Sequence, residues 1–172
     1  MTDERRIWVV WIIGLTLFAI AIALGMAITQ GSVTLGILEH QAAGTAERVN
    51  EIQAQWKAGD VRGIAIAAMV ADLAFIGVFA WGSYLLGRLL LANGAMPVRS
   101  IGAIVTASAI IFGLTDYIET ILQLIQLLLD RGIDGMAATA ATVRPVKVAT
   151  WIICFLGVLV GFTLRKLLAK RG

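Results

Sequence analysis

Two acidic residues, Asp116 and Glu119, lie one helical turn apart in the apolar segment GLTDYIETILQLIQLLLD, residues 113–130. Gln123 and Gln126 continue the spacing of three or four residues, so these polar side chains share one face of a helix. An ionised carboxylate within hydrocarbon costs about 2.5–3.5 kcal/mol, and paired carboxylates can form ion pairs, bind a ligand or exchange protons. The pattern therefore predicts a polar site within an apolar surrounding.

Further charged residues lie in or near other apolar stretches. Asp72 lies in VADLAF, and Arg144 and Lys147 lie in RPVKVATW. Three acids against two bases leave one carboxylate protonated or free to bind a cation. Two interpretations remain open: a buried ion-pair network that sets Asp72 and Glu119 against the two bases, and a site for a ligand or for protons. The candidate polar cluster comprises Asp72, Asp116, Glu119, Gln123, Arg144 and Lys147.

The composition indicates that these residues lie in a membrane protein. The chain has 172 residues, of which 59% are hydrophobic and 15% charged, whereas soluble domains are about half apolar and a quarter charged. A helix needs about 20 apolar residues to cross a bilayer. We expect an all-α membrane protein in which residues 1–172 form one bundle of four transmembrane helices, spanning about residues 7–28, 63–91, 101–129 and 142–164.

The distribution of Lys and Arg predicts the orientation of the bundle. On the side that bears both termini, basic residues outnumber acidic ones, and the clearest cluster is LRKLLAKRG near the end of the chain. Basic residues favour the cytoplasmic side of a membrane. Both termini are therefore expected in the cytoplasm, and residues 29–62 are expected to form an extracytoplasmic loop.

This loop contains a predicted amphipathic helix in the sequence GTAERVNEIQAQW. Thr45 is suited to cap its N-terminus, and Val49, Ile52 and Trp56 fall on one face. Trp56 is expected in the headgroup region of the membrane, where indole rings are enriched.

The same loop can fold over the mouth of a polar crevice formed by the cluster. His40 is expected to be a solvent-exposed loop residue, with a role at the crevice mouth as the alternative. The candidate lid residues are Glu39, His40, Thr45, Glu47 and Arg48.

The remaining motifs limit the function classes. One cysteine, Cys154, and one histidine allow no intramolecular disulfide and no multi-histidine site within one chain. No sequence motif of a hydrolase, a metalloprotease, a P-loop or a thiol redox site is present, so we assign no catalytic residue, metal or cofactor, and whether the protein is an enzyme stays open. The net charge of +3 gives no indication of nucleic acid as a partner.

Two small-residue motifs, Ser83-xxx-Gly87 and Gly157-xxx-Gly161, allow helices to approach closely. Packing within the bundle is the commoner use of such motifs, and contact between protomers is the other. The expected partners are membrane lipids and either a second copy of the chain or a larger membrane complex.

The order of several motifs resembles that of a functionally uncharacterised family of small four-span bacterial integral membrane proteins. They are an outer-loop Glu before AGTAER, a Trp, Asp72 on the second span, DxxE on the third and Lys147 on the fourth. Thr120 stands where the family pattern usually has Asn. The resemblance covers about residues 33–161 and implies a four-span fold in the bacterial plasma (inner) membrane, and it groups Glu39, Thr45, Glu47 and Arg48 with the cluster.

Three functions follow from these observations. The first is a structural or accessory membrane component in which the buried Asp/Glu/Lys cluster, open to the extracytoplasmic side, holds the helices together. The alternative is a protein that binds a lipid headgroup or a small amphipathic or cationic ligand. The second alternative is a small proton-coupled transporter, which requires a polar route to the cytoplasmic side.

Overall fold

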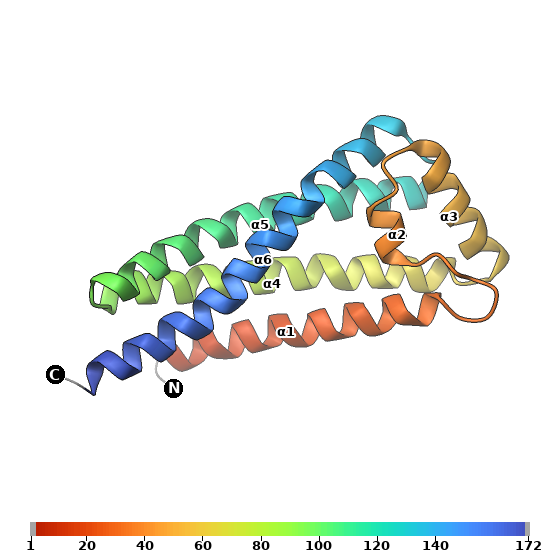
Figure 1. Ribbon diagram of the computed structural model, residues 1–172. Coiled ribbons are helices and arrows are strands. Elements are labelled where there is room, and N and C mark those ends of the chain that lie inside the picture. The colour runs from red at the N-terminus through yellow and green to blue at the C-terminus, as the bar shows by residue number, and fades with distance from the viewer. Residues whose placement is uncertain (1–2, 171–172) are drawn as a thin grey trace.

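The computed structural model describes residues 3–170, and within that range the chain forms six helices and no strand (Figure 1). Four of them are long and apolar enough to cross a membrane: α1 (Asp3–Ile28), α4 (Arg62–Asn93), α5 (Met96–Leu128) and α6 (Asp134–Ala169). The other two, α2 (Ile37–Gln41) and α3 (Ala46–Ala58), are short. The architecture is that of a multi-pass, all-α membrane protein with a four-helix bundle, as the composition predicts.

The long helices extend beyond the predicted spans. α5 begins at Met96, with Pro97 in its first turn, where a missing N–H costs nothing. α6 begins at Asp134, well before the predicted start near residue 142, and continues through Pro145. Hydropathy identifies only the apolar part of a helix, and residues rich in Ala continue the helical backbone beyond it.

Consecutive long helices pack side by side and run in opposite directions: α1 against α4, α4 against α5, and α5 against α6. The start of α1, the end of α6 and the α4–α5 turn lie at one end of the bundle, which we call the terminal end (Figure 1). Helices α2 and α3 lie at the opposite end (Figure 1). We call residues 29–61, which contain these two helices, the lid.

Small residues bring α1 and α4 into backbone contact. A Cβ atom on Gly14 would lie 2.8 Å from Phe79 Cα, and one on Gly82 would lie 2.9 Å from Trp11 Cα. Next to the second of these contacts the Trp11 indole N–H donates a hydrogen bond of 3.1 Å to the buried Ser83 hydroxyl. Both predicted small-residue motifs pack inside the bundle, because Gly87 faces Thr106 of α5 and Gly161 faces Leu90 of α4.

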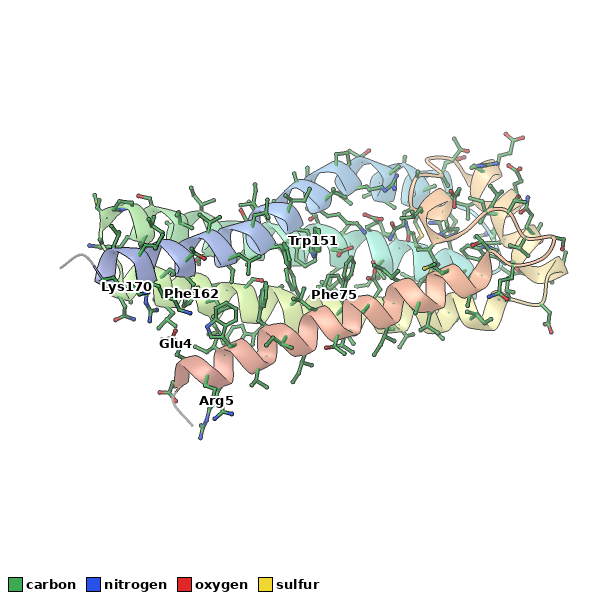
Figure 2. The ribbon with its side chains drawn as sticks, turned by 60° about the horizontal axis from the view of Figure 1, so that its bottom comes forward. Glu4, Arg5, Phe75, Trp151, Phe162 and Lys170 are labelled. Carbon is green, nitrogen blue, oxygen red and sulfur yellow. The ribbon has the colours of Figure 1, made fainter. Side chains whose placement is uncertain are left out.

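Aromatic rings fill the middle of the bundle. Phe18 of α1 lies 4.9 Å from Phe75 of α4 and 5.2 Å from Trp151 of α6, between ring centroids. Phe75 continues to Phe112 of α5 at 5.8 Å. Figure 2 shows Phe75 and Trp151 between the ribbons in the central part of the molecule. We call Phe18, Phe75, Phe79, Phe112 and Trp151 the aromatic layer.

Helices α1 and α6 meet between the aromatic layer and the terminal end. An ion pair of 2.9 Å joins Glu4 of α1 to Arg165 of α6. The Trp8 ring then lies 4.9 Å from Phe162, and the last ring contact toward the lid is that of Phe18 with Trp151. Beyond this contact the two helices diverge toward the lid (Figure 1).

Helix α3 is fixed to the turn between α5 and α6. Lys57 pairs with Asp130 at 2.7 Å, the Ala46 N–H donates to Asp134 Oδ1 at 2.7 Å, and the Gly132 N–H donates to Asn50 Oδ1 at 2.6 Å. The lid is therefore tied to the bundle through its C-terminal helix.

The predicted amphipathic helix of the lid is confirmed. The Thr45 hydroxyl caps α3 by accepting from the Arg48 N–H at 3.3 Å. The face that carries Val49, Ile52 and Trp56 is buried. The predicted position of Trp56 at the headgroups is wrong: its indole N–H donates to the Leu35 carbonyl at 2.6 Å, because the α1–α2 connection covers it.

Candidate functional site

Lys147 lies between the two acids of the α5 stripe. Its Nζ atom is 2.8 Å from Asp116 Oδ1 and 3.1 Å from Glu119 Oε1, and all three residues are buried. Gln123, one turn farther along α5, approaches the same Glu119 oxygen at 3.5 Å. The predicted buried Asp/Glu/Lys cluster therefore exists, with a single lysine shared by two carboxylates.

Asp72 does not take part in these ion pairs. Its Oδ2 atom accepts a hydrogen bond of 3.0 Å from the Thr120 hydroxyl of α5. Among the described residues, no basic side chain lies within the 4.0 Å of an ion pair to Asp72, and no carboxylate lies that close to Arg144. Of the expected pairings, only that of Lys147 with Glu119 forms.

The helix order explains this difference. Helix α6 packs mainly along α5 and much less against α4, so Lys147 reaches the stripe on α5 rather than Asp72 on α4. Thr120 was not predicted as a site residue, although its position directly after Glu119 in a polar stripe was a usable signal.

A cavity of about 700 Å³ adjoins the cluster at the lid half of the bundle. Side chains from α1, the lid, α4, α5 and α6 line it. Every polar residue predicted for the cluster except Glu119 is among them, and Glu119 lies behind Lys147. The charged residues that line the cavity are Glu39, Asp72, Asp116, Arg144 and Lys147.

The cavity opens on the side of the bundle, where α1 and α6 have diverged. Four apolar lining residues are themselves well exposed: Ile22 (46%) and Met26 (69%) of α1, Leu38 (64%) of α2, and Val148 (44%) of α6. A side chain that faces both the cavity and the outside marks an opening. The mouth is therefore framed by two long helices and the short α2, and its rim is apolar.

The aromatic layer forms the floor of the cavity. Phe18, Phe75, Phe112 and Trp151 all line it on the side of the terminal end. Phe79 is fully buried behind them, at 5.5 Å from both Phe75 and Phe112. The polar cluster is thus separated from the terminal end by a layer of packed aromatic rings.

His40 lies inside the lid, which corrects the expectation of a solvent-exposed loop histidine. It is 2% exposed, its ring is 4.9 Å from the Trp56 ring, and its Nε2 atom is 3.3 Å from Gln53 Nε2. Burial lowers the pKa of His40 to about 4, with a hydrogen bond to Gln123 acting in the opposite direction. The imidazole is therefore neutral across the physiological pH range.

The other predicted lid residues have separate roles. Glu39 lines the cavity, and its Oε2 atom accepts from the Gly36 N–H at 2.8 Å, which caps α2. Thr45 caps α3, Glu47 is exposed, and Arg48 pairs with Glu51 on the surface. None of these last three lines the cavity. Within residues 3–170, no group of three or more His, Cys, Asp or Glu side chains has the geometry of a metal site.

Comparisons with family models, with curated proteins and with solved structures found no match. The resemblance to the four-span bacterial family stays a prediction. The site combines a shared buried lysine, an apolar mouth, and an acid and a base that have no ion-pair partner among residues 3–170.

Proposed function

We propose that this protein binds an amphipathic molecule of the bilayer, which enters the cavity sideways between α1 and α6. The observation that carries the proposal is the pairing of an apolar mouth with a charged inner wall. Ile22 and Val148 stand at the mouth, while Asp72, Arg144 and Lys147 lie within the same cavity. An apolar tail fits between the helices, and a polar headgroup fits against the inner wall.

The size of the cavity supports this proposal. Ligand pockets have volumes of about 300–1,000 Å³ and combine apolar walls with a few polar groups that orient the ligand. The cavity here has about 700 Å³ and this composition. In the orientation that the basic residues predict, the lid faces the extracytoplasmic side of the plasma membrane and the ligand comes from the outer leaflet.

The expected role as a structural or accessory component is the competing proposal, and the Lys147 ion pairs support it. Buried ion pairs fix helix order, yet they contribute little net stability compared with apolar packing. A purely structural cluster also needs no adjoining cavity. The transporter hypothesis ranks last, because the aromatic layer occupies the position where a route to the terminal end would have to pass.

Filling the cavity tests the proposal. Ala21 of α1 lines the cavity, whereas Ala23 is exposed on another face of the same helix. We expect Ala21→Phe to block the ligand and Ala23→Phe to leave binding intact. The assay is thermal unfolding in detergent with and without added bilayer lipid. The signal is the reaction of a thiol dye with Cys154, which is the only cysteine and is buried.

Ligand at about 100 times its dissociation constant adds about 2.7 kcal/mol to stability, which corresponds to a Tm rise of about 5–11 °C for a chain of this size. Wild type and Ala23→Phe should show this rise, and Ala21→Phe should not. An equal rise in all three proteins, or none in wild type across a panel of lipids, contradicts the proposal.

A further inference from the structure

We propose that the ligand has a zwitterionic headgroup, whose cationic group binds Asp72 and whose anionic group binds Arg144. This inference depends on the proposed function and specifies the class of ligand. The charged residues that line the cavity differ in whether they already have partners within the protein.

The charge of Lys147 already has its ion-pair partners within the protein. Its ammonium contacts Asp116 at 2.8 Å and Glu119 at 3.1 Å, so these two carboxylates share one buried cation. A ligand that displaced Lys147 would leave buried carboxylates without a cation, which is costly. The headgroup is therefore held by charged residues other than this trio.

Asp72 has unused capacity to accept hydrogen bonds. A carboxylate has two oxygens with several acceptor positions, and the structure supplies Asp72 with a single donor, the Thr120 hydroxyl at 3.0 Å. Its carboxylate lines the cavity and has no basic partner within ion-pair distance among residues 3–170. An ammonium group supplies both the charge and the N–H donors that are missing.

Arg144 carries the opposite charge at the same cavity. Its guanidinium is permanently charged and forms paired hydrogen bonds with phosphate or carboxylate groups. It lines the cavity from α6 and has no carboxylate within ion-pair distance in the described part of the chain. Glu39, the other acid at the cavity, already accepts from the Gly36 N–H at 2.8 Å.

One unpaired acid on α4 and one unpaired base on α6 therefore face the same cavity without contacting each other. A headgroup with one sign of charge pairs with either Asp72 or Arg144. The other residue then loses contact with water and gains no partner, which is unfavourable. A headgroup with an ammonium and a phosphate satisfies both. The apolar mouth selects a molecule that carries acyl chains, so the ligand class is a phospholipid of the phosphoethanolamine type rather than a free headgroup.

Native mass spectrometry of the detergent-solubilised full-length protein tests this assignment. The probes are phosphatidylethanolamine, the anionic phosphatidylglycerol, a cationic trimethylammonium lipid of equal chain length, and glycerophosphoethanolamine, which has no chains. We expect wild type to retain phosphatidylethanolamine at least about tenfold more strongly than either singly charged lipid, which corresponds to about 1.4 kcal/mol. Glycerophosphoethanolamine should not bind measurably.

Charge-neutral variants separate the two halves of the headgroup. Asp72→Asn should abolish the preference over phosphatidylglycerol, and Arg144→Gln should abolish the preference over the cationic lipid. Asp60→Asn and Arg131→Gln, which alter exposed charges outside the cavity, should retain wild-type selectivity. Thermal unfolding of each variant shows whether it is folded.

Each result decides one part of the proposal. Equal retention of all three lipids by wild type, together with loss of lipid in Ala21→Phe, overturns the zwitterion assignment and leaves the proposed function standing. Selectivity that survives both Asp72→Asn and Arg144→Gln overturns the assignment of these residues. Binding of glycerophosphoethanolamine as strong as that of the lipid overturns the bilayer source. No retained lipid in wild type overturns the proposed function itself.

Discussion

Replacing Lys147 by Met should destabilise the protein more than any other single substitution in the polar cluster. The lysine is the shared cation for Asp116 and Glu119, at 2.8 and 3.1 Å. Both carboxylates are almost fully buried, and one oxygen of Glu119 has no hydrogen-bond partner even in wild type. Methionine keeps the length and most of the apolar stem of the side chain, so the change removes the charge with little loss of packing.

Breaking a buried ion pair by removing one partner costs about 3–5 kcal/mol, because the other partner remains buried without compensation. For a chain of 172 residues, each kcal/mol shifts Tm by about 2–4 °C. We therefore expect Tm to fall by about 6–20 °C in Lys147→Met. Thiol-dye unfolding of the detergent-purified protein measures this directly through Cys154, which becomes reactive only when the bundle opens.

A compensating variant separates the loss of charge from a loss of packing. In Lys147→Met combined with Asp116→Asn and Glu119→Gln, no ionised group remains in the trio, so at least half of the lost stability should return. A drop in Tm of less than about 2 °C in the single variant would show that the pairs do not hold the bundle. A drop that the triple variant does not recover would point to packing instead.

Two further predictions concern the lid and the helix contacts. Burial lowers the pKa of His40 from 6.5 to about 4, so the unfolded chain binds a proton first as the pH falls. Stability from the neutral imidazole is complete above about pH 6.5 and decreases by about 3 kcal/mol toward pH 4. Between these pH values, Tm should fall less steeply with decreasing pH in His40→Gln than in wild type. An equal pH dependence of Tm in the two proteins would contradict this. Gly14→Ala should lower Tm by several degrees, because the added Cβ would lie 2.8 Å from Phe79 Cα. Gly63→Ala is the control and should leave Tm unchanged, because Gly63 has open space around it. An unchanged Tm in Gly14→Ala would show that α1 and α4 can separate freely.

Hydropathy and spacing were sufficient to predict the bundle and the polar stripe. Long apolar runs require helices in a membrane, because each backbone group must find its hydrogen-bond partner within its own segment. The spacing of Asp116, Glu119 and Gln123 then places them on one face, as the structure confirms. The cap at Thr45 was also predictable, because capping depends on residues close together in the sequence.

The features that depend on contacts between distant segments were not predictable. Whether Asp72 pairs with a base of α6 depends on which helix α6 packs against, and a single sequence carries no signal for that packing. The burial of His40 depends on Trp56 and Gln53 of α3 and on α5, which lies far away in the chain. The cavity exists because α1 and α6 separate beyond Phe18 and Trp151, where no further ring pair joins them.

Photo-cross-linking from a lipid tail tests the lateral cavity most directly. A phosphatidylethanolamine with a diazirine on its acyl chain is incorporated with the protein into a bilayer. The sample is irradiated, and mass spectrometry then identifies the labelled residues. Met69, Phe75 and Phe112 are buried yet line the cavity, whereas Ile76 and Phe79 are equally buried and do not. We expect label on side chains that line the cavity, these first three included, and none on the last two; label confined to exposed side chains that do not line the cavity would contradict the account.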